Sequence, residues 1–163
     1  MPAIRTILPP LLGAILLASA AWADCEAPYE TLFACDIPER NAQVEFCQLI
    51  SSDNPDALPS SQYTYWADGQ VELQFQTNKT WFGLKNSITG MRGRPIGNGF
   101  ANGKTVYAFF FDGDAYVETH SVPREAQIHV YNNSDDFNSE AEPIARRHCY
   151  PPTIYVSPEG IGP

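Results

Sequence analysis

The segment VYAFFFDGDAYVET, residues 106–119, decides the fold class of this chain. Two apolar runs flank Asp112-Gly113, and an Asp-Gly pair between such runs is among the strongest sequence signals for a β-hairpin. A two-residue turn there would place Phe110 opposite Ala115. Both faces of the hairpin would then be largely apolar, which is typical of central strands covered on both sides. We therefore predict an all-β protein organised around this hairpin.

A second hairpin is expected in QYTYWADGQVELQFQ, residues 62–76. A two-residue turn at its Asp-Gly pair predicts three cross-strand pairs: Trp66 with Val71, Thr64 with Leu73 and Gln62 with Phe75. In this register Tyr63 and Tyr65 lie on the solvent side. The other expected strands are 31–37, 43–50, 81–88, 127–131 and 144–149, with a long glycine-rich loop at 89–103. Short strands at this spacing predict an antiparallel β-sandwich or a small barrel.

The first 23 residues have the pattern of an export signal. Arg5 precedes an apolar run, and Ala21-Trp22-Ala23 has the small-x-small pattern of a cleavage site. We expect a secreted or periplasmic protein with one β-domain, residues 24–150. A tail rich in proline and glycine follows at 151–163, and part of it could pair on a sheet edge. No later segment is apolar enough to predict a membrane span.

The chain is acidic, with 19 Asp and Glu against 10 Lys and Arg and a net charge of −9. Such a charge argues against a nucleic-acid-binding protein. The window 73–111 nevertheless contains no acidic residue and five basic ones, Lys79, Lys85, Arg92, Arg94 and Lys104. This is either chance loop composition or a basic face that meets an anionic group. Within it, the Arg92-Gly93-Arg94 loop is the best candidate for anion contact, because glycine lets backbone amides approach a ligand.

The four cysteines all follow the predicted signal, and an even count in an oxidising compartment predicts two disulfides. Three connectivities are possible. The preferred one is Cys35–Cys47 across the first hairpin and Cys25–Cys149 between the amino end and the last strand. No C-x-x-C spacing occurs, so neither a zinc site nor thioredoxin-like chemistry is expected.

The order of these features is familiar. The motif LFACD at 32–36, a following FC, then YTYWADGQVELQF and a late lone cysteine resemble a group of small exported bacterial proteins. That resemblance implies a compact β-fold stapled by disulfides. The segment Phe33-Ala34-Cys35-Asp36 is also similar to one in the periplasmic inhibitors of lysozyme, which are small β-barrels. Their binding loops have no recognisable counterpart here, so the resemblance assigns no binding residue.

No catalytic pattern stands out. There is no G-x-S-x-G elbow, and Ser121 beside His120 would point to the opposite face of a strand. His120 and His129 could meet across neighbouring strands, but no histidine spacing typical of a metal site occurs. Asp112-Gly113-Asp114 lacks the rest of a calcium loop. We predict no catalytic residue, no metal and no cofactor.

The candidate ligand-binding residues are therefore Arg92, Arg94, Tyr63 and Tyr65. Exposed tyrosines beside glutamines could stack on a sugar or seat a peptide, unless a second sheet covers them. We predict a non-catalytic exported module that binds or inhibits an envelope component or a secreted protein. Two alternatives stay open: a hydrolase of the cell wall or a secreted substrate with a scattered site, and a barrel-type carrier of a small apolar ligand.

Overall fold

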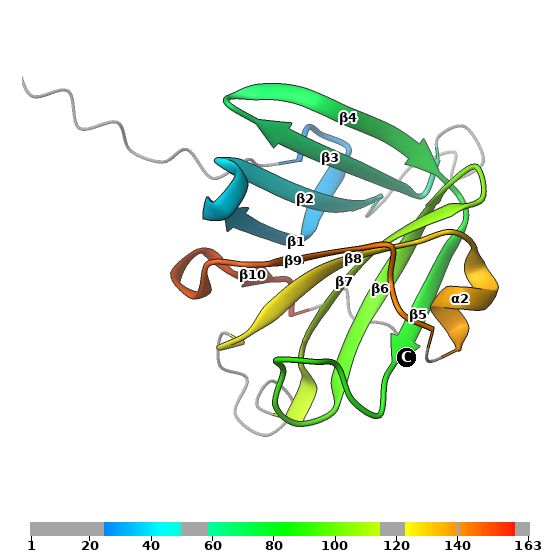
Figure 1. The fold of residues 1–163 in the computed structure, drawn as a ribbon. Coiled ribbons are helices and arrows are strands. Elements are labelled where there is room, and N and C mark those ends of the chain that lie inside the picture. The colour runs from blue at the N-terminus through cyan, green and yellow to red at the C-terminus, as the bar shows by residue number, and fades with distance from the viewer. Residues whose placement is uncertain (1–24, 50–58, 115–122, 140, 159–163) are drawn as a thin grey trace, which may run out of the picture.

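The computed structural model describes residues 25–49, 59–114, 123–139 and 141–158, which form two antiparallel five-stranded sheets stacked as layers (Figure 1). Sheet A has the strand order β10-β1-β2-β3-β4, with β1 (Tyr29–Ile37), β2 (Ala42–Leu49), β3 (Ser61–Ala67), β4 (Gln70–Thr77) and β10 (Tyr155–Val156). Sheet B has the order β5-β6-β7-β8-β9, with β5 (Thr80–Leu84), β6 (Pro95–Asn102), β7 (Thr105–Asp112), β8 (Ala126–Tyr131) and β9 (Ala145–His148). The all-β prediction is confirmed, and the two sheets make the fold a sandwich.

Aromatic side chains fill the space between the sheets. The rings of Phe33 on β1 and Phe109 on β7 stack with centroids 4.4 Å apart. Phe46 on β2 packs edge-on against both, at 6.0 Å from Phe33 and 4.9 Å from Phe109. All three are completely buried, and burial of each such ring contributes roughly 2–3 kcal/mol. This cluster holds sheet A against sheet B.

The outer face of sheet B carries a second, smaller core. The short helix α2 (Ser134–Asn138) lies outside this sheet (Figure 1) and inserts Phe137 against Phe110 of β7, with ring centroids 5.9 Å apart. Asn133 caps the helix by accepting a hydrogen bond from the Asp136 amide at 2.9 Å. Strand β7 is therefore apolar on both faces because both are covered, as predicted.

The predicted partner of β7 is wrong. Both edges of β7 are occupied, by β6 and β8, and Phe110 lies opposite Gly97 on one side and Gln127 on the other. No two-residue turn forms at Asp112-Gly113: the Gly113 amide donates to the Arg94 carbonyl at 3.2 Å, and neither residue has the positive φ of such a turn. Residues 115–119, the predicted second arm, lie outside the described residues.

The hairpin that contains β7 turns at Gly103 instead. Asn102 pairs with Thr105, and the intervening Gly103 has a φ of +63° that suits glycine. The predicted loop at 89–103 is thus wrong for its second half, which is β6. Its glycines gave the appearance of a loop, but Gly97 marks a close backbone approach: a Cβ there would overlap the carbonyl oxygen of Phe109.

The β3–β4 hairpin is confirmed, but its faces are reversed beyond the first pair. Trp66 lies opposite Val71 as predicted, and an irregularity then shifts the register so that Tyr65 pairs with Leu73. The predicted Thr64–Leu73 and Gln62–Phe75 pairs are wrong; Thr64 lies opposite Gln74 and Gln62 opposite Gln76. One extra residue in β4 places Leu73 and Phe75 on the same face as Tyr65 and Tyr63, and this shared apolar face packs inward.

The disulfides are Cys25–Cys47 and Cys35–Cys149, so the predicted pairing Cys35–Cys47 and Cys25–Cys149 is wrong. Cys35 lies opposite Val44, whereas Cys47 lies opposite Thr31 further along the same hairpin. Cys35 belongs to the core between the sheets and reaches Cys149 beyond the end of β9. Cys47 points to the other face, where the amino-terminal segment carries Cys25.

The other strand predictions hold within a few residues. Strands β1, β2, β8 and β9 lie where expected, β5 ends at Leu84 rather than 88, and β10 pairs with β1 on a sheet edge. The predicted signal at 1–23 lies outside the described residues. Across the described segments, no helix has the length and apolar character needed to cross a bilayer.

Candidate functional site

Tyr63 and Tyr65, which the sequence analysis placed on the solvent side of sheet A, pack toward the core in the structure. Tyr63 is 3% exposed, with its ring centroid 5.1 Å from Phe75 and 5.0 Å from Tyr107. Burial raises the pKa of the Tyr63 hydroxyl above its usual value. Tyr65 is half-buried against the same core. The solvent-side placement of Tyr63 and Tyr65 is wrong, and the buried ring of Tyr63 offers no open face to a ligand.

The Arg92-Gly93-Arg94 loop carries exposed arginine side chains, but its amides already bind carboxylates of the protein. The Arg92 amide donates to Glu125 at 3.0 Å and the Arg94 amide donates to Asp114 at 3.2 Å. The Arg92 side chain also lies 3.8 Å from a Glu125 oxygen. Both acids come from outside the basic window, so folding brings negative charge to this loop. Anion binding by Arg92 and Arg94 stays a prediction that now rests on their side chains alone.

The outward face of sheet A is polar and regularly hydrogen-bonded. Gln76 donates to Gln62 at 3.1 Å and Gln74 donates to Thr64 at 3.3 Å across the β3–β4 pair. These cross-strand pairs form because the register shift sends the polar residues of both strands to the same side.

At one end of this face lies Trp66, the aromatic residue that the sequence analysis placed in the core. Cross-strand pairing sets Asp36, Gln43 and Trp66 side by side on β1, β2 and β3. The Gln43 amide donates to the Asp36 carboxylate at 3.0 Å, which fixes both planar groups next to the indole. Trp66 is half-buried, so part of its ring stays accessible.

These side chains line a surface groove of about 490 Å³. The lining residues are Asp36, Pro38, Asn41, Ala42, Gln43, Trp66 and Gly69. The two turns that border the groove are tied together: Asn41 donates from its side chain to Asp68 at 2.8 Å, and the Asp68 amide donates to the Asn41 carbonyl at 3.0 Å. The rim is therefore held in place before any ligand arrives.

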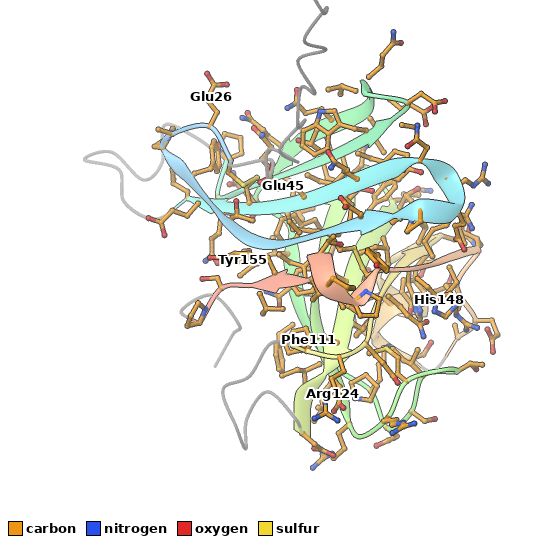
Figure 2. All side chains as sticks on the ribbon, turned by 90° about the vertical axis from the view of Figure 1, so that its left-hand side faces the viewer. Glu26, Glu45, Phe111, Arg124, His148 and Tyr155 are labelled. Atoms are coloured by element: carbon orange, nitrogen blue, oxygen red, sulfur yellow. A yellow bond between two sulfur atoms is a disulfide. The ribbon has the colours of Figure 1, made fainter. Side chains whose placement is uncertain are left out.

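Glu45, labelled on β2 in Figure 2, is a buried carboxylate near the middle of sheet A. It accepts a hydrogen bond from the Thr31 hydroxyl at 2.8 Å. Its oxygens and the sulfurs of Cys25 and Cys47 lie within 4.8 Å of one another, which is metal-site spacing. The two sulfurs are bonded to each other in a disulfide, however, and so are not thiolate ligands.

His129 on β8 is the other buried ionisable group of interest, and it lies on the outer face of sheet B. Its Nε2 is 3.0 Å from the Gln127 carbonyl oxygen and its Nδ1 is 3.0 Å from the Tyr131 hydroxyl. Gln127 donates its amide to the Thr89 carbonyl at 2.8 Å, so its oxygen faces the imidazole. The imidazole therefore donates from Nε2 and accepts from Tyr131 at Nδ1. With both nitrogens engaged, His129 is not free to act as a general base.

This network makes a pH dependence of stability testable. Burial first, and then the charges of Arg146, His148 and Lys85, lower the pKa of His129 to about 3. The unfolded chain takes up a proton near pH 6.5, so stability is complete above that pH and falls as the pH drops toward 3. Between about pH 6.5 and 4.5 the loss should be about 2 kcal/mol. Urea unfolding at several pH values across this range measures the loss. In a His129→Gln variant the unfolding free energy should fall less with decreasing pH than in the parent. The same pH dependence in both proteins would contradict the prediction.

Sequence reasoning missed the Trp66 groove. The extra residue of β4 lies between Val71 and Leu73, directly beside Trp66, and a period-2 pattern gives no signal for such an irregularity. Comparison of the chain with protein-family models, with curated protein sequences and with solved structures gave no significant match. The chemistry of this protein is therefore argued from its own residues.

Proposed function

We propose that this protein is an exported, non-catalytic binding module that recognises a neutral saccharide chain of an envelope component through the Trp66 groove. The observation that carries the proposal is the half-buried indole of Trp66 beside the hydrogen-bonded Asp36–Gln43 pair. Two disulfides agree with an oxidising, extracellular compartment.

The chemistry of the groove favours a sugar over an apolar ligand. An indole offers a flat apolar face to the C–H side of a pyranose ring, while a carboxylate and an adjacent amide bind neighbouring hydroxyls. The groove of about 490 Å³ falls in the size range of small-ligand sites, and this volume is large enough for one or two sugar rings. The exposed side chains of Gln74 and Gln76 lie on the same face, with Gln62 partly exposed beside them, and could bind further units of a chain.

The charge of the groove favours a neutral sugar. Asp36 is an acid, Asp68 lies at the rim, and no basic side chain is among the lining residues. The chain as a whole carries −9, so an anionic glycan would be repelled.

The test is binding of the folded protein to an array of neutral and anionic oligosaccharides, followed by calorimetry with the best neutral probe. Trp66→Ala should weaken that probe about thirtyfold, since a central aromatic contact is worth about 2 kcal/mol. Phe82→Ala is the matched control, because Phe82 is an exposed aromatic on β5 of the other sheet. Full affinity in Trp66→Ala, or a preference for anionic glycans, would refute the proposal.

A further inference from the structure

A second cavity lies on the outer face of sheet B, away from the groove of sheet A. It has a volume of about 150 Å³ and is formed by the loop after β5, by β8, by the segment after α2 and by β9. Its lining residues are Lys85, Ser87, Ile88, Thr89, His129, Tyr131, Ser139, Ala141, Glu142, Pro143 and Arg146. A space of this size holds about five waters, or an organic molecule of about five to eight heavy atoms.

Two cations face this cavity. Lys85 is 7% exposed and donates to the carbonyl oxygens of Phe137 and Ser139 at the end of α2, the latter at 2.7 Å. Arg146 extends from β9, the strand whose His148 is labelled in Figure 2. The charges of Arg146 and Lys85 both help to keep the pKa of His129 low, which shows that they act on the same small region.

The guanidinium of Arg146 has a hydrogen-bond partner at Nη2 but, among the described residues, none at Nε. Its Nη2 lies 3.1 Å from an oxygen of Glu142, while its Nε is buried and has no hydrogen-bond partner in the described structure. Nε–H and Nη2–H form one edge of the guanidinium, and that edge matches the two oxygens of a carboxylate. The side chain of Glu142 is 85% exposed, so moving it into water costs little.

We propose that this cavity binds the carboxylate group of a small organic acid on the Nε–Nη2 edge of Arg146, in place of Glu142. The acid's two oxygens satisfy both donors at once, which a single oxygen of Glu142 does not. Its short apolar part lies among Ile88, Ala141 and Pro143. Lys85 lines the same cavity and supplies a second positive charge.

The experiment uses butyrate as the probe and inorganic phosphate as the competing anion, at constant ionic strength. Binding is followed through the NMR signal of the Arg146 Nε–H and through the thermal midpoint. The full-length protein should show saturable binding of butyrate with a shift of that signal. Glu142→Gln should bind butyrate severalfold more tightly, because the competing carboxylate is gone.

Arg146→Lys keeps the charge but removes the two-donor edge, and it should weaken butyrate at least tenfold. Arg40→Lys, a change at an exposed arginine in the turn between β1 and β2 of the other sheet, is the matched control and should bind as the parent does. The proposal is overturned if butyrate does not saturate, if Glu142→Gln leaves its affinity unchanged, or if phosphate binds more tightly than butyrate. The Glu142→Gln result decides the matter even if Arg146→Lys fails to fold.

Discussion

Removal of the Cys35–Cys149 disulfide should cost about 5 kcal/mol of unfolding free energy. The bond closes a loop with a sequence separation of 114 residues, and a cross-link removes more conformational freedom from the unfolded chain as the loop grows. The Cys35→Ala, Cys149→Ala double variant should therefore unfold at much lower urea concentration. It should also unfold with a steeper slope, because its unfolded chain is more expanded.

The other disulfide supplies the control. Cys25–Cys47 has a separation of 22 residues, for which the same relation gives about 3 kcal/mol. The Cys25→Ala, Cys47→Ala variant should lie between the parent and the first variant in a urea titration. The reverse order would show that local packing around the cysteines, rather than loop closure, dominates their contribution.

Replacement of Gly97 by alanine should destabilise the protein by more than about 3 kcal/mol. The new Cβ would overlap the Phe109 carbonyl oxygen and lie 2.7 Å from its carbonyl carbon and 3.0 Å from the Phe110 Cα. These are backbone atoms of the neighbouring strand, so relief requires β6 and β7 to move apart, at a cost above that of ordinary overpacking.

Gly83→Ala on β5 is the matched control, because its new Cβ would meet only side chains, with Phe137 Cζ nearest at 2.8 Å. A ring can tilt where a backbone cannot, so this variant should lose about 1–2 kcal/mol. Thermal and urea unfolding of both variants measures the difference. Equal losses would contradict the close approach of β6 to β7.

Local patterns were enough to locate most strands. Alternation in 31–37 and 43–50 and the Asp68-Gly69 turn predicted β1 to β4, because those signals arise within a few residues. The Asp112-Gly113 pair gave a wrong prediction of a hairpin because it, too, is only a local signal. Whether such a pair forms a hairpin turn depends on which strands lie beside it, and here both edges of β7 are occupied by β6 and β8.

The site could not be predicted, because a single irregularity decides which side chains it contains. Without the register shift after Trp66–Val71, Leu73 and Phe75 would share a face with Trp66 and Thr64; with it, they share the inner face with Tyr65 and Tyr63, and the glutamines of β4 lie on the outer face. The disulfides failed for a related reason, since the face on which a cysteine lies follows from strand parity and not from sequence separation. Tertiary packing therefore determines both the register of β4 and the pairing of the cysteines.

The edge pairing of β10 with β1 has a consequence for biosynthesis. A ribosome makes the chain from its amino end, so β1 emerges early, while its partners Tyr155 and Val156 emerge more than 100 residues later. Cys149, the partner of Cys35, is also synthesised late. Until residues 149–156 have been made, β1 has one bare edge and Cys35 a reduced thiol, so this side of sheet A is completed only after the strands of both sheets have been synthesised.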